Sequence, residues 1–263
     1  MKTLEQLLAV GRYTGLGLLL TCTANTADKN NSGDSGSEDT ALYDTGDTGD
    51  TSSESCVAWE QTFGGSEYDS ISSVQQTNDG GYALAGTMYS FESQGFDGLL
   101  IKTDGDGNKQ WEQTFGGSDD DQIKSLQQTM DEGYVMAGYT YSSGAGGMDG
   151  WLVKTDADGN KQWEKTFGGS ESDYIYSVQQ TTDGGYVLVG YTDSFGAGES
   201  DGWLVKTDGE GSKQWEQTFG RSKYESGFLS VVQTTDGGYV LAGYMNSSGA
   251  GSYDSWLVKT CDK

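Results

Sequence analysis

The sequence predicts an all-β fold, a four-bladed β-propeller, and three observations carry that prediction. First, the motif WEQTFG, or its variant WEKTFG, recurs every 52 residues, beginning at Trp59, Trp111, Trp163 and Trp215. Second, each repeat contains four short segments in which apolar and polar residues alternate, as they do in β-strands. Third, turns rich in Gly, Asp and Asn separate these segments. Four strands in a unit of this length are typical of a propeller blade.

The first unit shows the expected strands most clearly. They are Ser73–Thr77, Tyr82–Thr87, Leu99–Thr103 and Lys109–Phe115. The same pattern places blades at about residues 70–115, 122–167, 174–219 and 227–260, the last after one extra residue near Gly227. No helical periodicity follows the first 22 residues.

The fourth unit lacks its last strand, because the chain ends at SWLVKTCDK. The stretch CVAWEQTFGG, at 56–65, matches the missing strand. A propeller removes its exposed sheet edges when an N-terminal strand completes the C-terminal blade. We therefore expect residues 57–63 to pair with the strand of Trp256–Thr260 and to close a ring formed by residues 56–263.

Two cysteines stand at this expected seam. Cys261 aligns with Asp104 and Cys56 with Asn108, and in an intact blade those two positions flank one tight turn. Residues so placed lie near disulfide distance. The alignment predicts a Cys56–Cys261 disulfide, and the alternative is two unrelated free thiols.

Charge and composition exclude several classes of function. The chain has 15 Lys and Arg against 40 Asp and Glu, a net charge of −25, and no His. This balance argues against nucleic acid, which proteins bind with basic patches, and against electrostatic attraction to anionic membranes. Without His, no His-based nucleophile and base pair can form, and no Ser-Lys or Cys pattern replaces it.

The first 55 residues differ from the repeats. Residues 1–22 combine Lys2 and Arg12 with a short apolar run, as secretory signals do. The ending LLTC resembles that of a bacterial lipoprotein signal, which implies a lipidated Cys22 and an exported protein anchored by lipid to the bacterial membrane or cell surface. The alternatives are plain secretion and an intracellular chain. Residues 23–55 are acidic and rich in Ser, Thr, Asp and Gly, so we expect a disordered tether.

The repeat sequence, with its TFGGS, DGGY and DGWLVKTD segments, resembles the SBBP-type β-propeller repeats of bacterial and archaeal cell-surface proteins. The resemblance covers about residues 57–259. It implies an extracellular β-propeller. It carries over no catalytic residues, because that family has no catalytic motif.

The turns between the third and fourth strands of a blade are candidate cation sites. Their oxygen-bearing residues are Asp104, Asp106 and Asn108 in the first unit and Asp156, Asp158 and Asn160 in the second. Oxygens at positions 1, 3 and 5 are typical of a calcium loop, but the later Gly and Glu of an EF-hand are absent. Plain turns and weak Ca²⁺ sites both remain open, and we expect no other cofactor. The seven tryptophans recur at fixed positions, so we expect them to pack between blades rather than to stack on sugars.

Blade connectivity places the longer loops on one face, where binding sites usually lie. A ring of aspartates precedes the third strand of each blade: Asp97, Asp149, Asp201 and Asp254. They either cap the loops or surround a ligand or metal. A unique ligand would instead contact residues that break the repeat, among them Phe91, Phe96, Phe195, Tyr253 and Lys124.

The sequence therefore predicts a monomeric, non-catalytic propeller displayed at the cell surface that binds a protein or a polysaccharide. One alternative is a glycoside hydrolase that uses acidic residues of the loop face. Such an enzyme needs two carboxyls with different pKa values, whereas symmetry-related aspartates have near-equal surroundings. The other alternative is a purely structural surface component.

Overall fold

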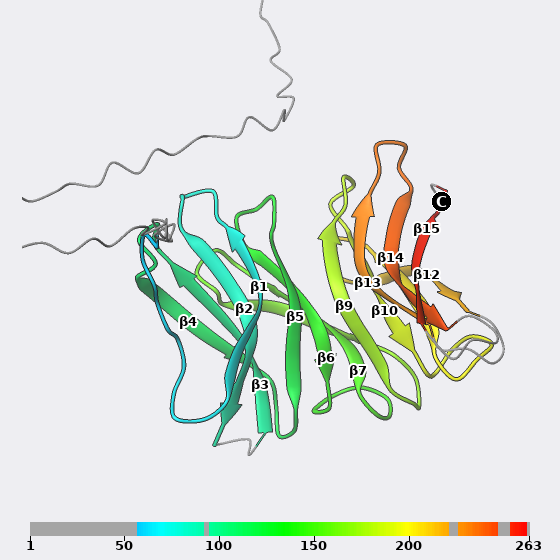
Figure 1. Ribbon diagram of the computed structural model, residues 1–263, viewed down its shortest axis with the longest axis horizontal. Helices are drawn as coiled ribbons and strands as arrows, with labels where there is room; N and C mark the ends of the chain where they lie inside the picture. Colours follow the sequence, from blue (N-terminus) through cyan, green and yellow to red (C-terminus); the bar gives the residue numbers. More distant parts are fainter. Residues whose placement is uncertain (1–56, 92–94, 221–225, 247–252, 262–263) are drawn as a thin grey trace, which may run out of the picture. The chain divides into compact units, whose positions relative to one another are not determined.

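The computed structural model describes residues 57–91, 95–220, 226–246 and 253–261, and in these residues the chain forms fifteen strands and no helix (Figure 1). The strands make four antiparallel sheets. The described residues from Trp59 onward belong to one compact unit. No helix in the described part of the chain could span a lipid bilayer. The signal and tether expected at residues 1–55, with Cys22, lie outside the described residues.

Each sheet corresponds to one repeat, and its strands are hydrogen-bonded in chain order. The first sheet contains β1 (Asp69–Gln76), β2 (Tyr82–Ser90), β3 (Gly95–Thr103) and β4 (Lys109–Phe115). The second contains β5 (Asp121–Gln128), β6 (Tyr134–Thr140), β7 (Asp149–Thr155) and β8 (Lys161–Phe167). The third contains β9 (Asp173–Gln180), β10 (Tyr186–Thr192), β11 (Asp201–Thr207) and β12 (Lys213–Phe219). The fourth contains β13 (Ser226–Gln233), β14 (Tyr239–Asn246) and β15 (Tyr253–Lys259). The predicted all-β fold of four repeated antiparallel units is confirmed.

Tight turns join the first two strands of each sheet. In the first sheet the Thr77 amide donates to the Gly81 carbonyl and the Gly80 amide donates to the Thr77 carbonyl. Gly80 adopts a φ of 85°, a left-handed conformation that glycine accepts without a steric cost. Glu132 occupies the same position in the second sheet, with a φ of 66°. Its repeat thus places a side chain where the turn favours glycine.

Three apolar cores lie between successive sheets. Between the first two sheets, Leu100 packs with Ile123, Met136 and Trp151, all of them buried. Equivalent residues fill the second and third cores. Aromatic pairs repeat in the same way, since Trp111 lies 5.9 Å from the Tyr134 ring and Trp163 lies 5.9 Å from the Tyr186 ring. The predicted packing of repeat tryptophans between repeat units is therefore confirmed at these junctions.

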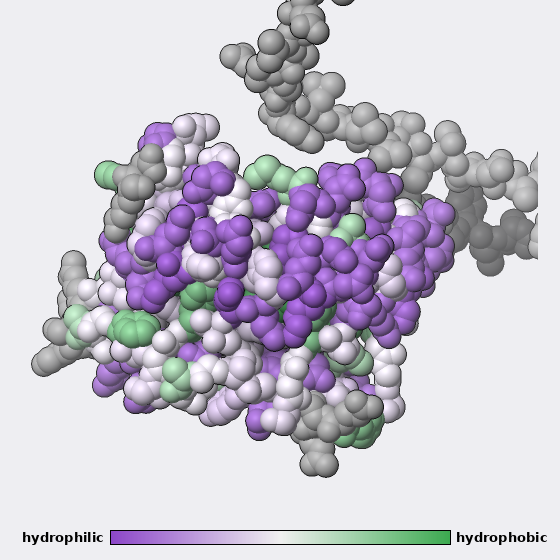
Figure 2. Space-filling view, turned by 180° about the vertical axis from the view of Figure 1, so that it is seen from behind, coloured by the Kyte–Doolittle hydropathy of each residue, from purple (hydrophilic) through white to green (hydrophobic). Residues whose placement is uncertain are grey.

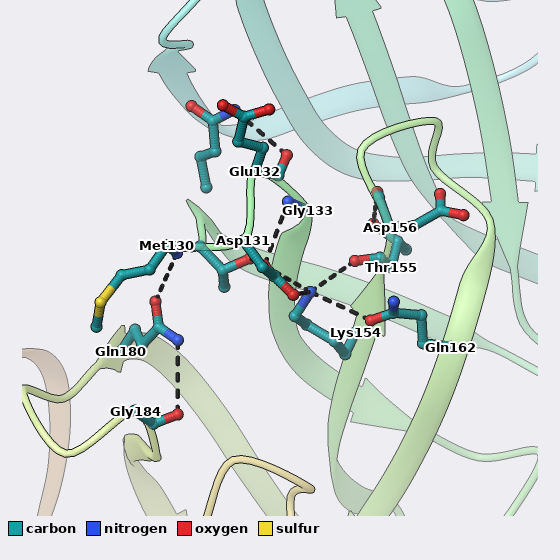
Figure 3. Close-up of polar contacts among 12 residues, drawn as sticks. Met130, Asp131, Glu132, Gly133, Lys154, Thr155, Asp156, Gln162, Gln180 and Gly184 are labelled. Atoms are coloured by element: carbon teal, nitrogen blue, oxygen red, sulfur yellow. Dashed lines mark hydrogen bonds and ion pairs between the residues drawn. The ribbon is translucent and has the colours of Figure 1, made fainter.

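Each of the first three sheets also buries one lysine: Lys102, Lys154 and Lys206. In the second sheet Lys154 Nζ donates to both oxygens of Asp131, at 3.1 and 2.9 Å, and to the Thr155 carbonyl at 2.7 Å (Figure 3). Gln162 Oε1 accepts a further bond from it at 3.3 Å. Because every ammonium proton has an acceptor, the buried charge is compensated.

The fourth sheet has three strands in the described residues, and β15 pairs only with β14. The predicted pairing of residues 57–63 with β15 is not formed there, because 57–65 contains no strand. Trp59 instead packs on the first sheet, 5.7 Å from the Tyr82 ring. It also covers Gly107, where an added β-carbon would lie 2.8 Å from the indole. Trp111 contacts Tyr134 and Gly159 of the second sheet in the same manner.

Candidate functional site

The longer loops gather on one side of the molecule, the lower side of Figure 1, which we call the loop face. Its described segments are 64–68, 116–120 and 168–172 between sheets, and 91, 141–148 and 193–200 within them. The tight turns lie on the opposite side. The surface seen from behind is mainly hydrophilic, with apolar residues in small separate patches (Figure 2). Exposed aromatic side chains nevertheless gather at one place on the loop face.

One such cluster, the aromatic patch, consists of Tyr68, Tyr89, Phe91 and Phe96. Phe96 lies edge-on to Tyr68 at 6.0 Å and to Tyr89 at 5.6 Å. Tyr89 in turn contacts Phe91 at 5.5 Å. Phe91 and Tyr68 are strongly exposed. The patch thus unites two residues, Phe91 and Phe96, that were predicted from their departure from the repeat.

The loops of the second sheet lie against this patch. The Phe96 amide donates to Asp120 Oδ1 at 2.9 Å, and the Asp120 carbonyl accepts from the Tyr141 amide at 2.9 Å. An open pocket of 330 Å³ at this junction is lined by Gly95, Ser118, Asp119, Asp120 and Tyr141. A second pocket, of 400 Å³, shares Ser118 and is lined also by Ser90, Asp97, Thr114, Phe115, Gly116 and Gly117. Aromatic surfaces, carboxylates and hydroxyls thus converge between the first and second sheets.

The aspartates of the predicted ring are in different surroundings. Asp149 and Asp201 are buried and bond to their own loops, Asp149 Oδ2 accepting from the Ala145 amide at 2.8 Å and Asp201 Oδ2 from the Ala197 amide at 2.7 Å. These are capping bonds. Asp254 is exposed on β15, and Asp97 lines the larger pocket. The capping role is therefore seen for Asp149 and Asp201, whereas Asp97 borders a pocket and Asp254 lies on an exposed strand.

Buried carboxylates face each other at the sheet junctions. A β-carbon placed on Gly168 would lie 2.1 Å from Asp149 Oδ1 and 2.6 Å from Asp173 Oδ2. Burial, with the neighbouring Asp173 carboxylate adding to it, raises the pKa of Asp149. Asp97 and Asp121 flank Gly116 in the same way. At the third junction Ser226 occupies the position of Asp173, so this acidic pair is absent there.

The structure adds a tyrosine cluster that the sequence reasoning missed. Tyr174 lies 4.9 Å from Tyr139 of the second sheet and 4.6 Å from Tyr191 of its own sheet. Tyr176 stacks on Tyr191 at 5.9 Å. Lys124, one of the residues that break the repeat, lies 5.3 Å from the Tyr139 ring centre. Burial, and then Tyr176, raise the pKa of Tyr139 to about 12, so its hydroxyl stays protonated near neutral pH.

Phe195 and Tyr253 do not join the aromatic patch. Phe195 packs on Trp203 at 6.1 Å in the third sheet, and Tyr253 lies edge-on to Tyr244 at 5.3 Å in the fourth. Of the aromatic residues predicted from repeat breaks, two therefore come together and two stand apart on other sheets.

The candidate calcium turns hold hydrogen bonds within the turn. Asp104 Oδ1 accepts from the Asp106 and Asn108 amides at 3.0 and 2.9 Å, and Asp104 Oδ2 accepts from the Asn108 side chain at 3.0 Å. The Asn108 side-chain bond is the main reason why the pKa of Asp104 is lowered. Asp156, Asp158 and Asn160 repeat these bonds in the second sheet. No group of three or more His, Cys, Asp or Glu side chains with metal-binding geometry occurs among the described residues.

The predicted disulfide stays a prediction. Cys261 is exposed, lies two residues after the end of β15, and forms no disulfide within the described residues. Cys56 lies outside the described residues.

Comparisons with known proteins give no family. No protein-family model matches the chain, and no curated protein matches it. Among solved structures, an acylaminoacyl peptidase from Pyrococcus horikoshii is similar with a TM-score of 0.39 and 12% identity over 70% of this chain and 31% of that chain. Sqt1 from Chaetomium thermophilum is similar with a TM-score of 0.39 and 15% identity, over 67% and 42%. This chain thus spans less than half the length of either.

Proposed function

We propose that this chain is a non-catalytic β-propeller that binds polysaccharide through its loop face. The observation that carries the proposal is the aromatic patch beside the pocket of Ser118, Asp119 and Asp120. Exposed aromatic rings offer flat apolar surfaces to the C–H faces of sugar rings. Carboxylates and hydroxyls beside them accept and donate hydrogen bonds to sugar hydroxyls.

Two features favour binding over hydrolysis. A glycoside hydrolase needs an accessible pair of carboxyls, one of them with a raised pKa. The pKa of Asp149 is raised, but this residue is buried and its Oδ2 is bonded to the Ala145 amide. Asp119 and Asp120 border the pocket on one loop, and both carboxylates already accept hydrogen bonds, Asp120 from the Phe96 amide and Asp119 from the Ser118 hydroxyl.

The propeller itself is part of the proposal. We propose that residues 57–63 supply the fourth strand of the β13–β14–β15 sheet, which would remove an exposed sheet edge. Trp59 supports this, because its contacts with Tyr82 and Gly107 match those of Trp111 with Tyr134 and Gly159. Residues 59–63 thus already contact the first sheet as the last strand of a preceding blade would.

The sequence of residues 1–55 supports display at a bacterial cell surface. A lipid on Cys22 and an acidic tether would hold the propeller away from the membrane, with its loops accessible to extracellular polymers.

The test is binding to an array of bacterial and host polysaccharides, with a matched pair of variants, each measured with and without Ca²⁺. Phe91→Ala removes a side chain that is 69% exposed on the loop face, and Met130→Ala removes one that is 70% exposed in a turn on the opposite side. We expect Phe91→Ala to weaken binding about tenfold, ~1.4 kcal/mol, and Met130→Ala to leave it unchanged. Binding to none of the polysaccharides, or equal losses in both variants, would refute the proposal.

A further inference from the structure

The first sheet exposes side chains that the other sheets bury. Ile71 is 40% exposed, whereas Ile123 and Ile175, at the same position of the next two repeats, are 0% exposed. Val74 is also exposed, whereas its equivalents Leu126, Val178 and Val231 are buried. With Trp59, Phe63, Tyr82 and Leu84 these residues line an apolar pocket of 400 Å³. We call this surface the leading face of the first sheet.

The fourth sheet shows the complementary exposure. Leu257 of β15 is 71% exposed, whereas Leu100, Leu152 and Leu204, at the same position of the first three sheets, are 0% exposed. Those three leucines each pack into the core with the following sheet. Leu257 has no following sheet in the described arrangement. We call this surface the trailing face of the fourth sheet.

The leading face and the trailing face correspond to the two sides of the junction that occurs three times between successive sheets. At the first two internal junctions a serine Oγ accepts a hydrogen bond from a backbone amide of the next sheet, Ser73 from Leu126 and Ser125 from Val178, both at 3.2 Å. Ser230 holds this position on the trailing face. Val232 differs, because it replaces the glutamine equivalent to Gln127 and makes this surface more apolar. The leading face is thus the natural partner of a trailing face.

Within one chain the leading face and the trailing face do not meet, since Ile71, Val74 and Leu257 all stay exposed. Figure 1 places β4 and β15 at opposite sides of the molecule. The three junctions repeat the same bonds, with Gln75, Gln127 and Gln179 each accepting from a backbone amide of the next sheet at 2.7, 2.5 and 2.7 Å. Close-packed cores resist the change in angle that closing the arc within one chain would require. A second copy can continue the same junction without any such change.

We propose that the leading face of each chain binds the trailing face of a second copy, giving a two-fold, head-to-tail ring of eight blades. This inference rests on the proposed completion of the fourth sheet, and it identifies the chain that supplies the strand. In the register of β3 with β4, Leu100 lies opposite Gln113 and Lys102 opposite Trp111. Leu257 of one copy then lies opposite Gln61 of the other, and Lys259 opposite Trp59.

A specific polar contact accompanies this register. Trp151 Nε1 donates to Glu164 Oε2 at 3.3 Å, and Trp203 Nε1 donates to Glu216 Oε2 at 3.2 Å. In both cases the glutamate follows the tryptophan of the fourth strand. Trp256 on β15 would therefore donate to Glu60 of the second copy, which follows Trp59.

The first test is the mass of the full chain in solution. Cys22→Ser chains, which carry no lipid at that position, are examined by sedimentation velocity under reducing conditions. We expect a dimer that Leu257→Arg and Ile71→Arg each weaken at least tenfold, because a charge would be buried in an apolar junction. Met130→Arg, at a side chain as exposed as Leu257 but in a turn, should leave the dimer unchanged. A folded monomer at micromolar concentration, or a dimer that neither end-face variant weakens, would overturn the proposal. Circular dichroism shows whether each variant is folded.

The second test uses the cysteines that remain and separates this proposal from sheet completion itself. Oxidised Cys22→Ser chains should run as covalent dimers on a non-reducing gel. A mixture of Cys56→Ser chains with Cys261→Ser chains, both also carrying Cys22→Ser, should give mixed dimers joined once. A monomer with an internal Cys56–Cys261 bond would show that the sheet is completed within one chain. That result would contradict the proposed dimer but not the proposed completion of the fourth sheet. Chains without any such bond that are monomeric in the first test would contradict both.

Discussion

At the scale of single residues, each turn between the first two strands depends on one left-handed residue. Three of the four repeats use glycine there, Gly80, Gly184 and Gly237, and the second uses Glu132. A β-carbon at Gly80 or Gly184 would meet no atom within 4 Å, so the cost at Glu132 comes from its backbone conformation alone. That cost is about 1 kcal/mol for a residue with a side chain.

We therefore expect Glu132→Gly to stabilise the protein slightly. Relief of the left-handed conformation is partly offset by the greater freedom of glycine in the unfolded chain, which leaves a net gain of about 0.5 kcal/mol. Urea denaturation monitored by tryptophan fluorescence would measure it. Thr182→Gly, one residue before the equivalent Asp183-Gly184 pair, is the control and should destabilise. A loss of stability in Glu132→Gly would contradict this account of the turn.

The aspartates of the same turns give the protein a specific acid sensitivity. The hydrogen bond from Thr77, followed by that from Lys102, lowers the pKa of Asp79 to about 2. A carboxyl whose folded pKa is lowered contributes stability above its unfolded pKa, and that contribution disappears as the pH falls through the folded pKa. The difference in melting temperature between wild type and Asp79→Asn should be constant above about pH 5 and shrink steadily as the pH falls from there through about 2. A difference that grows on acidification would contradict the assignment.

At the scale of elements, the repeat made most strands predictable. The expected strand Lys109–Phe115 is β4 as observed, whereas β3 begins at Gly95, four residues before the expected Leu99. The extension follows from pairing of Phe96 with Tyr89, which lengthens the hairpin into the loop face. The alternation of apolar and polar residues cannot predict this longer strand, because the extension depends on contacts among aromatic side chains on the loop face.

The candidate site was predictable only in part. Phe91 and Phe96 could be predicted because they break the repeat. An aromatic residue that occurs in only one repeat does not serve the packing common to all of them. The tyrosine cluster was missed although Tyr139, Tyr191 and Tyr244 recur at one position. The cluster forms because Tyr174 contacts Tyr139 of the neighbouring sheet, and the spacing of the two sheets, not the local sequence, determines that contact.

The proposed fourth strand of the last sheet also predicts that Lys259 becomes buried. The Lys259 side chain is 44% exposed beside Asp236, whereas that of Lys154 is 4% exposed beside Asp131. If residues 57–63 cover β15, Lys259 becomes a buried lysine like the others. We then expect Lys259→Met to cost about as much as Lys154→Met, on the order of 1–3 kcal/mol, since the carbonyl that accepts from each lysine loses a buried partner.

Urea denaturation of the two variants, with Lys109→Met as an exposed control, would measure these costs. A cost below about 1 kcal/mol for Lys259→Met, the usual value for an exposed ion pair, would mean that β15 stays uncovered.

At the scale of the whole molecule, the four similar sheets present two kinds of surface, the loop face and the two end faces. The loop face carries the aromatic patch and pocket between the first and second sheets, and no other sheet repeats that arrangement in the described residues. The two end faces carry apolar residues that the internal junctions bury. The proposed binding and the proposed assembly thus use different surfaces, so a variant of one surface should leave the other function intact.

The central claim is that residues 57–63 form the fourth strand of the last sheet, and amide hydrogen exchange tests it most directly. The segment WEQTF occurs at 59–63 and again at 111–115 within β4, so the two copies have the same intrinsic exchange rates within the segment. We expect residues 59–63 and β15 to be protected to a degree similar to residues 111–115. Exchange of 59–63 at the rate of an unpaired chain, while 111–115 remains protected, would contradict the claim.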